Sequence, residues 1–485
     1  MTALAFADGF YQADSLTSMN MVCQNMYPKY VDLGNGELFP RLQYTPGFNS
    51  LLSVGVSTDT NRGLHEVGDS AYSVNGNGLY LLDIGSPFPS GTFLGTISGT
   101  SQVSMADNGS QLIVIDPGSN NGYIYNQDTS TFSKITDPGF TANGTPQYVV
   151  FIDGYFMVST DTNRFIVSAL RDGTTWNALD FGSAESDPDS IVGLINYKNE
   201  AYIFGTQTCE AFQNIGGAGF PFQRNGLILD KGLSYPLSVV QAANTFMWIG
   251  SSSEEQDAVY QLLGNQAVKI SNTAIELLIN QAQGFLEPQQ RRNVRGYSYM
   301  EDGSFFVCWN LPEVTICYDI YTQKWHTRTS RIDTGNTEVD LAWRCINIIQ
   351  RPNGQLLSGD LYTNSINQVS RLTPNEGGTL IHRLFDARPI RVEKRAFSIP
   401  LIELTMETGT QQNIIPEKVV EMSISRDAFN FGAARAREAG DVGQFRRRIR
   451  WRRNGTFTDY GQFRFRTTDP ITVVGLDAEF RVGRG

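Results

Sequence analysis

The sequence predicts an all-β protein made of a β-propeller with six or seven blades, a C-terminal antiparallel β-sheet or sandwich domain and an extended N-terminal arm. Its 485 residues include 47 Gly, 29 Phe and 20 Tyr, which supply the turns and the strand-forming aromatic side chains of a β fold. A turn followed by a short apolar run recurs along most of the chain. The net charge changes sign near residue 383, which indicates a second domain.

Residues 1–60 carry no blade pattern and are predicted to form the extended arm. They contain Pro28, Pro40 and Pro46, and proline lacks the backbone donor that a central strand needs. Such an arm can complete the last blade of a propeller, or it can join the C-terminal sheet as a platform. The sequence does not decide between these two roles.

Residues 61–382 carry the repeat that predicts the propeller. Each turn contains an Asn or Asp, and the steps from one to the next are 31, 45, 46, 45, 58 and 51 residues. Most of these steps fit one propeller blade of about 40 to 50 residues. The seven turn residues are Asn77, Asn108, Asp153, Asn199, Asn244, Asp302 and Asn353.

The backbone preferences of these residues explain why hairpin turns are predicted at these positions. Asn-Gly and Asp-Gly pairs, such as Asn77-Gly78 and Asp153-Gly154, tolerate the positive φ angles of tight hairpin turns. The apolar run after each turn suits a strand buried on both faces beside the central channel. Aromatic hairpins later in several units, such as Tyr123 to Phe132, are interpreted as outer blade strands. The alternative is a set of unrelated hairpins in two sandwiches.

The longest step holds a predicted short helix near residues 271–288. Thr273 and Glu276 have the spacing of a capping box, and Ile275 and Ile279 share one helical face. This helix either docks a partner on the propeller surface or covers a blade with its apolar face. The second role is the commoner one for a helix of this pattern.

The charge distribution predicts a basic C-terminal β domain over residues 383–485. Residues up to His382 include 19 basic and 36 acidic side chains, a net charge of −17. From Arg383 onward there are 19 basic and 13 acidic side chains, a net charge of +6, and the two parts together give the −11 of the whole chain. The overall acidity argues against a general nucleic-acid-binding protein.

Period-two alternation in the C-terminal domain predicts a half-exposed antiparallel sheet with an arginine face. Arginines alternate with Ile449 and Trp451 on one strand, and two more alternate with Phe463 and Phe465 on a later strand with the same outward charge. These arginines are candidates for contact with another subunit or a partner protein. The candidate interface residues are Arg446, Arg448, Arg450, Arg452, Arg464 and Arg466.

Three interpretations of this arginine face are open. The arginines can pair with carboxylates across the sheet, namely Glu403, Glu407 and Glu421. They can form a subunit interface. They can also contact DNA, although the acidic rest of the chain would repel a phosphate backbone unless this face lay well apart from it.

The sequence carries no motif for catalysis, a cofactor or a metal, so it predicts a protein that is not an enzyme and needs neither cofactor nor metal. The five cysteines form no CxxC pair and are predicted to be reduced, buried thiols. His65, His326 and His382 lie far apart in sequence, without the close spacing of a metal-ligand pair.

Two further features bear on enzyme and membrane functions. The acidic pairs at residues 187 and 189 and at residues 254 and 255 could be considered for a glycosidase, but they lie in Ser- or Pro-rich stretches typical of surface loops. No apolar run approaches the roughly 18 residues that cross a bilayer, and the chain starts with a polar stretch, so neither a membrane anchor nor a signal peptide is expected.

A set of short motifs follows one order along nearly the whole chain. In sequence order they are Gln24–Pro28, Pro46–Phe48, Arg62–Leu64, Ile191–Leu194, Ala201–Gly205, Lys231-Gly232, Tyr318-Asp319 with Trp325, Gly359–Leu361, Arg450–Arg453, Phe463–Arg466 and Asp469-Pro470. The ordered set resembles the packaged-DNA stabilisation proteins, or tail accessory hub (nozzle) proteins, of short-tailed bacteriophages. Each motif alone is weak, and the resemblance rests on their order.

The resemblance implies a structural virion protein that contains a β-propeller and has no catalytic residues. It implies a homo-oligomeric ring, a hexamer, below the portal and its adaptor ring, which continues the DNA channel and retains the packaged genome. It further implies tailspikes or fibres on the flank of the ring, a plug or needle protein at its end, and duplex DNA that passes without sequence-specific binding. The implied location is the virion tail, after assembly in the host bacterial cytoplasm.

Charge is compatible with that role, and two other functions are alternatives. A channel that lets duplex DNA slide is better lined by acidic or neutral groups than by cations that grip phosphates, and the net −17 of the first 382 residues fits this. The first alternative is a propeller adhesin or glycan-binding tail protein, because aromatic side chains can stack on sugars. The second is a glycosidase, which needs two carboxyl groups about 5 to 9.5 Å apart.

Overall fold

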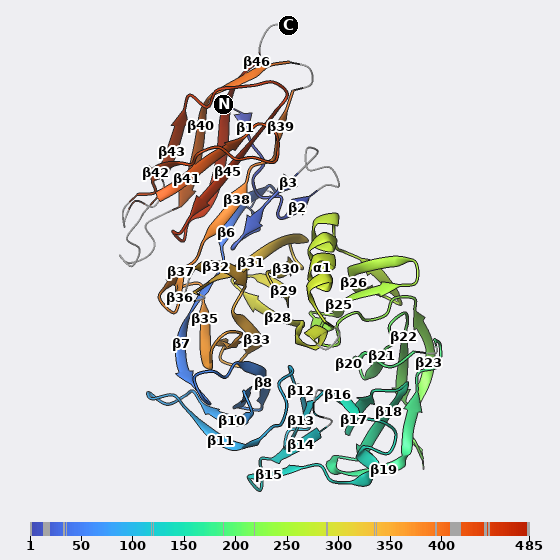
Figure 1. Ribbon diagram of the computed structural model, residues 1–485. Helices are drawn as coiled ribbons and strands as arrows, with labels where there is room; N and C mark the ends of the chain where they lie inside the picture. Colours follow the sequence, from blue (N-terminus) through green and yellow to red (C-terminus); the bar gives the residue numbers. More distant parts are fainter. Residues whose placement is uncertain are drawn as a thin grey trace.

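The structure is a computed structural model that describes residues 2–482 except 13–19, 33, 35, 118, 120, 188, 218, 288–289, 334, 336, 393–394, 408–418, 441–443 and 445–446. It consists of a propeller with a smaller β-sandwich at its rim (Figure 1). The described residues form one α-helix, α1 (Thr273–Phe285), and two short 3-10 helices, η1 (Pro138–Phe140) and η2 (Gln290–Asn293). The predicted all-β class, with a propeller and a C-terminal β domain, is confirmed.

Seven four-stranded antiparallel units follow one another around the propeller, within the six or seven predicted. The first strands of neighbouring units surround the centre, and the last of them, β33, packs against the first, β8. The first three units are β8 (Asn61–Val67), β9 (Ser70–Asn75), β10 (Gly78–Asp83), β11 (Ser90–Thr96); β12 (Ser104–Asp107), β13 (Gln111–Asp116), β14 (Asn121–Asn126), β15 (Thr131–Lys134); and β16 (Pro146–Ile152), β17 (Tyr155–Thr160), β18 (Arg164–Ala169), β19 (Asp172–Ser183). The next three are β20 (Gly193–Tyr197), β21 (Glu200–Phe204), β22 (Cys209–Asn214), β23 (Phe222–Leu229); β24 (Val240–Ala242), β25 (Thr245–Ser252), β26 (Glu255–Leu263), β27 (Gln266–Lys269); and β28 (Arg295–Glu301), β29 (Ser304–Asn310), β30 (Thr315–Asp319), β31 (Lys324–Asp333).

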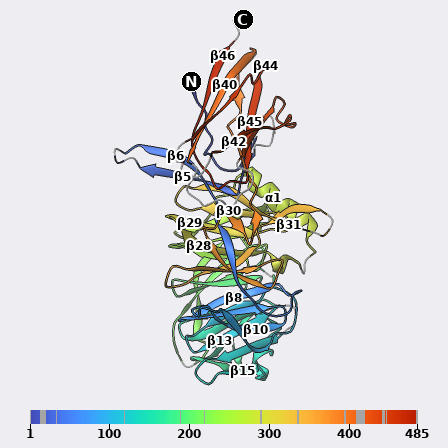
Figure 2. The same cartoon turned by 90° about the vertical axis from the view of Figure 1, so that its left-hand side faces the viewer.

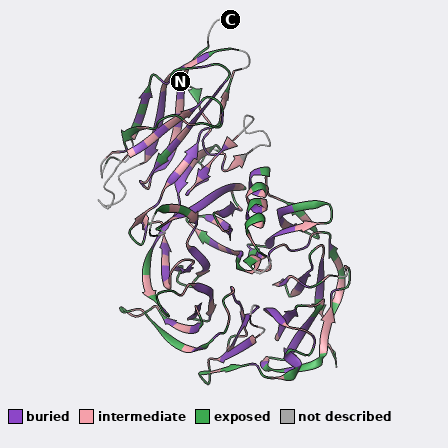
Figure 3. Cartoon of the chain, in the orientation of Figure 1, coloured by how far each residue is buried: buried purple, intermediate pink, exposed green. Residues whose placement is uncertain are grey.

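In six units the predicted turn joins the first strand to the second. Asp153 and Gly154 have φ of 47° and 89° between β16 and β17, and Asp302 and Gly303 have 51° and 76° between β28 and β29. The apolar run after each turn is the second strand of its unit, so it lies one strand out from the centre and not beside the channel as predicted. These strands are buried between neighbouring units, whereas the outermost strands are largely exposed (Figure 3).

The first unit explains the short first step of the repeat. Asn77 lies between β9 and β10, and the turn between β8 and β9 contains Gly68 and Asp69. Counted from Asp69, the step to Asn108 is 39 residues and not 31. The first step is short because Asn77 marks the second turn of its unit, whereas the other six residues mark the first turn of theirs. The blade itself is not shortened.

The seventh unit is closed by a strand from the N-terminal arm. Three of its strands are β33 (Cys345–Gln350), β34 (Leu356–Asp360) and β35 (Ser365–Ser370), and the fourth is β7 (Gly47–Ser53), which pairs antiparallel with β35. The short strands β36 (Asn375–Glu376) and β37 (Thr379–Leu380) extend this sheet beyond β7. Residues from both ends of the propeller sequence thus share one sheet, which holds the ring of units closed.

Gly47 allows this closing strand to approach its neighbour, and Gly47→Ala is expected to destabilise the fold by about 1 to 3 kcal/mol, the usual cost of overpacking. A Cβ at this position would lie 2.0 Å from the Asn375 carbonyl oxygen and 2.7 Å from that of Thr373. Urea denaturation of the purified chain would measure the loss. Gly85→Ala is the control, because a Cβ there meets nothing within 4 Å. Equal denaturation midpoints for both variants would contradict the close approach of β7 to residues 373–375.

The rest of the arm joins the sandwich, so different parts of the arm take the two roles that the sequence left open. The hairpin of β5 (Met26–Asp32) and β6 (Leu38–Tyr44) extends the sheet of β46 (Thr472–Val482), to which β1 (Thr2–Ala3) also pairs. Figure 2 shows this hairpin projecting sideways where sandwich and propeller meet. The strands β2 (Tyr11–Gln12) and β3 (Asn20–Met21) form a separate small hairpin.

Two sheets face each other in the sandwich. One has the order β43 (Arg447–Arg452), β40 (Phe397–Glu407), β46, β6 and β5, with β44 (Thr456–Phe457) beside β40. The other has the order β4 (Cys23–Gln24), β38 (Arg383–Asp386), β45 (Tyr460–Thr467), β41 (Val419–Ser425) and β42 (Arg435–Glu438), with β39 (Ile390–Arg391) beside β45. This second sheet continues into the propeller, because β4 also pairs with β31, whose other end pairs with β32 (Glu338–Ala342).

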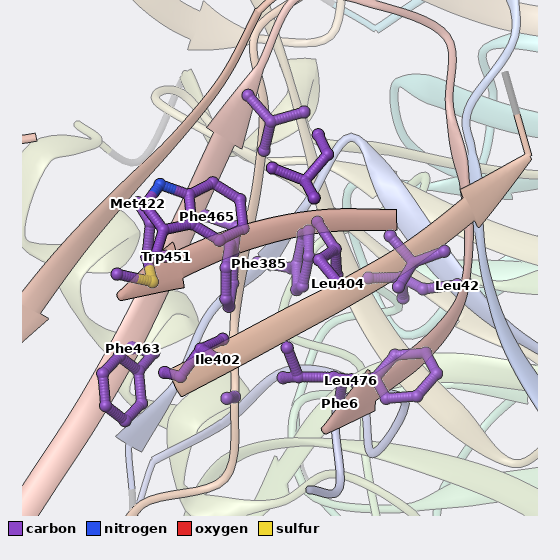
Figure 4. Close-up of a cluster of buried hydrophobic side chains, with 14 of the residues drawn as sticks. Phe6, Leu42, Phe385, Ile402, Leu404, Met422, Trp451, Phe463, Phe465 and Leu476 are labelled. Carbon is purple, nitrogen blue, oxygen red and sulfur yellow. The ribbon is translucent and has the colours of Figure 1, made fainter. Parts of the chain in front are cut away.

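The sandwich core confirms the predicted alternation. Ile402, Leu404 and Trp451 from the first sheet meet Phe463 and Phe465 from the second, and all five are fully buried (Figure 4). Burial of this kind is the main stabilising contribution to a sheet that is exposed on its other face. The side chains between these core residues, including the arginines, therefore point away from the core.

The predicted helix covers a blade. Its N-cap is Asn272, whose side chain accepts a hydrogen bond from the Ile275 amide at 3.1 Å, so the capping-box prediction placed the cap at the wrong residue in Thr273. The apolar face, with Ile275 and Ile279 fully buried, packs in the core shared by the fifth and sixth units. The interpretation that its apolar face covers a blade is the one that the structure bears out.

The connection after α1 reaches across the propeller centre. Arg292 donates to the Pro117 carbonyl at 2.8 Å and Arg295 to the Val103 carbonyl at 2.7 Å, both on loops of the first two units. The side chain of Asn293 accepts from the Gln102 amide at 3.4 Å. The side chains of Arg292, Asn293 and Arg295 therefore bridge this connection and the start of the sixth unit to the first two units.

Candidate interaction surface

The arginine-rich strand β43 forms one edge of its sheet and presents its guanidinium groups to solvent. The side chains of Arg448 and Arg450 are 57% and 47% exposed, and Arg452 is also exposed. On the neighbouring strand β40, Glu403 lies between two of them, with Nε to carboxylate distances of 3.7 Å to Arg448 and 2.5 Å to Arg450. One carboxylate is thus shared by two cations, and the face keeps a net positive charge.

Cross-strand pairing therefore accounts for part of the arginine face. The other two carboxylates proposed from the sequence do not pair with the arginines of β43. Glu407 pairs with Arg41 of the N-terminal arm at 3.3 Å, and Glu421 lies opposite Arg466 on the other sheet. The arginines of β43 therefore outnumber their carboxylate partners, and the strand keeps an excess of positive charge.

The buried side of β43 holds the strand in place. Trp451 is fully buried, and its indole N–H donates to the Arg435 carbonyl on β42 at 2.8 Å. Its ring lies edge-on to Phe465 at 5.6 Å between centroids. Such packing and a satisfied indole donor fix the strand against the core, so the arginines project from a rigid support.

A basic seam lies between β43 and β42, the edge strands of the two sheets. We give this name to the groove of about 520 Å³ lined by Ala436, Arg437, Glu438, Arg447, Arg448, Ile449 and Arg450. Four arginines and one glutamate line the seam. The glutamate, Glu438, lies 3.7 Å from Arg447 and its side chain is 86% exposed, so it screens little of the positive charge.

Strand β45 directs its arginines outward, as predicted, but on the opposite side of the sandwich from those of β43. Strand β45 belongs to the second sheet, and because both strands direct their apolar residues into one core, their arginines point in opposite directions. Arg464 forms a bidentate ion pair with the buried Asp386, at 2.7 and 2.9 Å. Arg466 lies beside His382, with 3.3 Å between NH2 and Nδ1.

The six candidate arginines therefore do not form one patch. Arg448, Arg450 and Arg452 share the outer face of the first sheet, Arg464 and Arg466 lie on the second, and Arg446 lies outside the described residues. Sequence reasoning also missed the arginines of β42, of which Arg437 lines the seam and Arg435 lies beside it in sequence. Arg435 and Arg437 alternate with Ala436 on β42, and this Arg-x-Arg spacing was the available signal.

A larger groove of about 1210 Å³ lies on the outer face of the same sheet. Its floor is mainly apolar, with Leu4, Phe39 and Val474 among the lining residues. Carboxylates of the N-terminal arm and of the sheet also line it, together with Arg41 and Arg448. Arg448 thus lines both this groove and the basic seam, so the two hollows adjoin.

The titratable residues of the propeller core are enclosed and structural. Arg328 is fully buried, with its guanidinium 4.6 Å from the Trp343 ring centroid and 4.8 Å from that of Phe306. Cys317 lies between Cys308 and His326 across three strands, and burial lowers the pKa of His326. All five cysteines are free and buried, as predicted. Cation–π contacts of this kind stabilise the core of the sixth unit and fix the connection that leads to the seventh.

The acidic pairs considered for a glycosidase serve local structure. Asp189 accepts hydrogen bonds from the Thr206 amide and hydroxyl, and Glu255 pairs with Lys231 at 3.1 Å. Over the described ranges no group of three or more His, Cys, Asp or Glu side chains is arranged to hold a metal ion. In the same part of the chain, no helix has the length and apolarity to cross a membrane.

Taken together, these features define a propeller–sandwich protein with an exposed basic seam. A family model described as "Bacteriophage P22 Gp10, beta-propeller" matches residues 2–373, and one described as "Bacteriophage P22 Gp10, beta-sandwich" matches residues 382–483. The chain belongs to this bacteriophage P22 Gp10 family. The suspected relationship to tail hub and stabilisation proteins of short-tailed phages is confirmed.

Individual relatives are more distant. The chain is 23% identical over 420 residues to the "Tail hub protein gp10" of Salmonella phage P22, covering 83% of this chain and 85% of the relative. Among solved structures, the WD40 β-propeller domain of Doa1 matches with a TM-score of 0.40 and 12% identity, over 68% of this chain and 98% of that one. A structure described as YCF48 bound to D1 peptide matches with a TM-score of 0.39 and 12% identity, over 67% and 94%.

The family relationship supports a structural role in the tail hub and a location in the virion tail. It also indicates assembly with other tail components.

Proposed function

We propose that this chain forms a ring in the phage tail hub that continues the DNA channel below the portal and adaptor and retains the packaged genome. The family match over both domains is the observation that carries the proposal. In this role the ring is a hexamer, carries tailspikes or fibres on its flank, holds a plug or needle protein at its end and assembles in the host bacterial cytoplasm. The protein acts without catalysis, cofactor or metal.

The charge and shape of the subunit support this role. The acidic propeller and the basic sandwich give each subunit two charged ends, and charge complementarity orients the assembly of such subunits. The side chains of Arg292 and Arg295 reach loops of the first two units across the propeller centre. We therefore assign the DNA path to the space between subunits and not to the centre of a single propeller. An acidic surface there would let the duplex slide without binding its phosphates.

The tryptophan side chains weigh against the adhesin alternative. A glycan-binding propeller needs exposed aromatic rings at its mouth, yet all six tryptophans of the chain are buried. They are Trp176, Trp248, Trp309, Trp325, Trp343 and Trp451. Because carbohydrate stacking requires an accessible ring face, these residues stabilise the core and do not form a sugar site.

Filled heads from a phage with a nonsense mutation in this gene would test the proposal. The heads are expected to package DNA and then to lose it, because no hub closes the channel, and DNase-resistant DNA per head measured over time would show the loss. Heads from the parent phage are the control. Heads that retain their DNA while the particles fail to adsorb to host cells would overturn the proposal and favour the adhesin.

A further inference from the structure

We propose that the free edge of β43 binds an extended acidic segment of another tail protein, which adds to the sheet as a strand while its carboxylates pair with the arginines of the basic seam. The assignment of the partner to the phage tail rests on the proposed function. The binding mode rests on the backbone and charges of β43 alone.

Among the residues that the structure describes, no strand pairs with one edge of β43. Its hydrogen-bonded neighbour within the described residues is β40, on one side. Arg453 donates to the Pro400 carbonyl at 2.9 Å, and in the antiparallel register this contact makes Arg452 and Leu401 a non-hydrogen-bonded pair. By the same alternation, the N–H and C=O groups of Arg448 and Arg450 point away from β40 toward the open edge.

The side chains of this edge favour an acidic partner. Residues on one face of a strand repeat at about 6.6 to 6.8 Å, so alternate carboxylates of an added strand match alternate arginines. Arg448 and Arg450 supply both an outward guanidinium and outward backbone groups. The Arg452 carbonyl already accepts a hydrogen bond from Arg435 at 3.1 Å, which confines the open edge to residues 447–450.

Two observations favour another protein over DNA or a second copy of this chain. Unpaired strand edges are matched by another peptide backbone, not by a phosphate backbone. Within this chain, β32 has alternating carboxylates, but Glu338 already pairs with Arg331 at 2.5 Å and Asp340 lies 3.8 Å from His382.

Binding of a synthetic peptide to the purified full chain tests the proposal. The probe is a fluorescein-labelled peptide of four Glu-Val repeats, with four Lys-Val repeats and a 20-base-pair DNA duplex as comparison ligands. The acidic peptide is expected to bind, and replacing the seam arginines Arg447, Arg448 and Arg450 together by Ser should weaken binding by about tenfold or more, since three ion pairs with the peptide are removed. Replacing Lys134, Arg171 and Lys269 by Ser is the charge-matched control and should leave the affinity unchanged.

Hydrogen exchange separates strand addition from simple charge attraction. Bound peptide should slow exchange of the Arg448 and Arg450 amides. Arg448→Pro, which removes one outward N–H, should weaken binding more than Arg448→Ala, and circular dichroism of each variant checks its fold. Failure of the acidic peptide to bind, unchanged exchange at both amides, tighter binding of the duplex, or a change of oligomeric state in place of peptide binding would each overturn the proposal. DNA retention by phage heads is measured separately, so either proposal can fail alone.

Discussion

Asp386→Ala is expected to destabilise the folded chain by about 3 to 5 kcal/mol, the usual cost of breaking a buried ion pair. The Asp386 side chain is fully buried and accepts both bonds of the Arg464 guanidinium, at 2.7 and 2.9 Å, and a third from the Val22 amide at 3.1 Å. Removing it leaves a largely buried cation without its partner where β38 joins the arm to the sandwich. Urea denaturation midpoints of the purified chain would measure the loss.

A double variant identifies the cause of that loss. Arg464→Leu removes the cation, so adding Asp386→Ala in that background should cost clearly less than Asp386→Ala alone. Equal costs in the two backgrounds would show that the ion pair is not what stabilises this junction.

Glu376→Gln is expected to stabilise the chain by about 3 kcal/mol at pH 8 and by little at pH 4.5, because 1 pKa unit corresponds to about 1.4 kcal/mol. Burial raises the pKa of Glu376 from its ordinary 4.5 to about 7. The folded chain therefore holds this proton more tightly than the unfolded chain, and the stability it contributes is lost as the pH rises from about 4.5 to about 7. Glutamine does not ionise, and its carbonyl can still accept the Trp343 indole N–H that Glu376 accepts at 2.9 Å.

Urea denaturation at pH 4.5 and pH 8 measures this difference. Glu254→Gln is the control, since Glu254 is exposed and its variant should match the parent at both pH values. If Glu376→Gln shifts the denaturation midpoint equally at both pH values, ionisation of Glu376 is not responsible.

The sequence carried enough information to predict the blades because their signals are local. Asp153-Gly154 and Asp302-Gly303 mark hairpin turns through their own backbone preferences, and the apolar runs after them are buried as expected. Local signals do not reveal which strands become neighbours. The pairing of β7 with β35 joins Phe48 to Val369 across most of the propeller sequence, and no turn or spacing records it.

The candidate interface was predicted in part for the same reason. Period-two alternation fixes the face of a side chain, so the outward direction of Arg448, Arg450 and Arg452 on β43 was predictable from Ile449 and Trp451. Alternation does not fix the sheet to which a strand belongs. The strand that carries Arg464, β45, therefore has the same alternating pattern as β43 but belongs to the opposite sheet. The partner of Arg464, Asp386, lies 78 residues away in the sequence, so no local pattern could predict their ion pair.

A cryo-EM reconstruction of the tail of the mature virion tests the central claim most directly. The account predicts a closed ring of this chain around the tail axis below the head, with each sandwich in contact with a neighbouring tail protein through the seam arginines Arg448 and Arg450. The claim would be contradicted if the chain lay at the distal ends of the fibres or were missing from the virion.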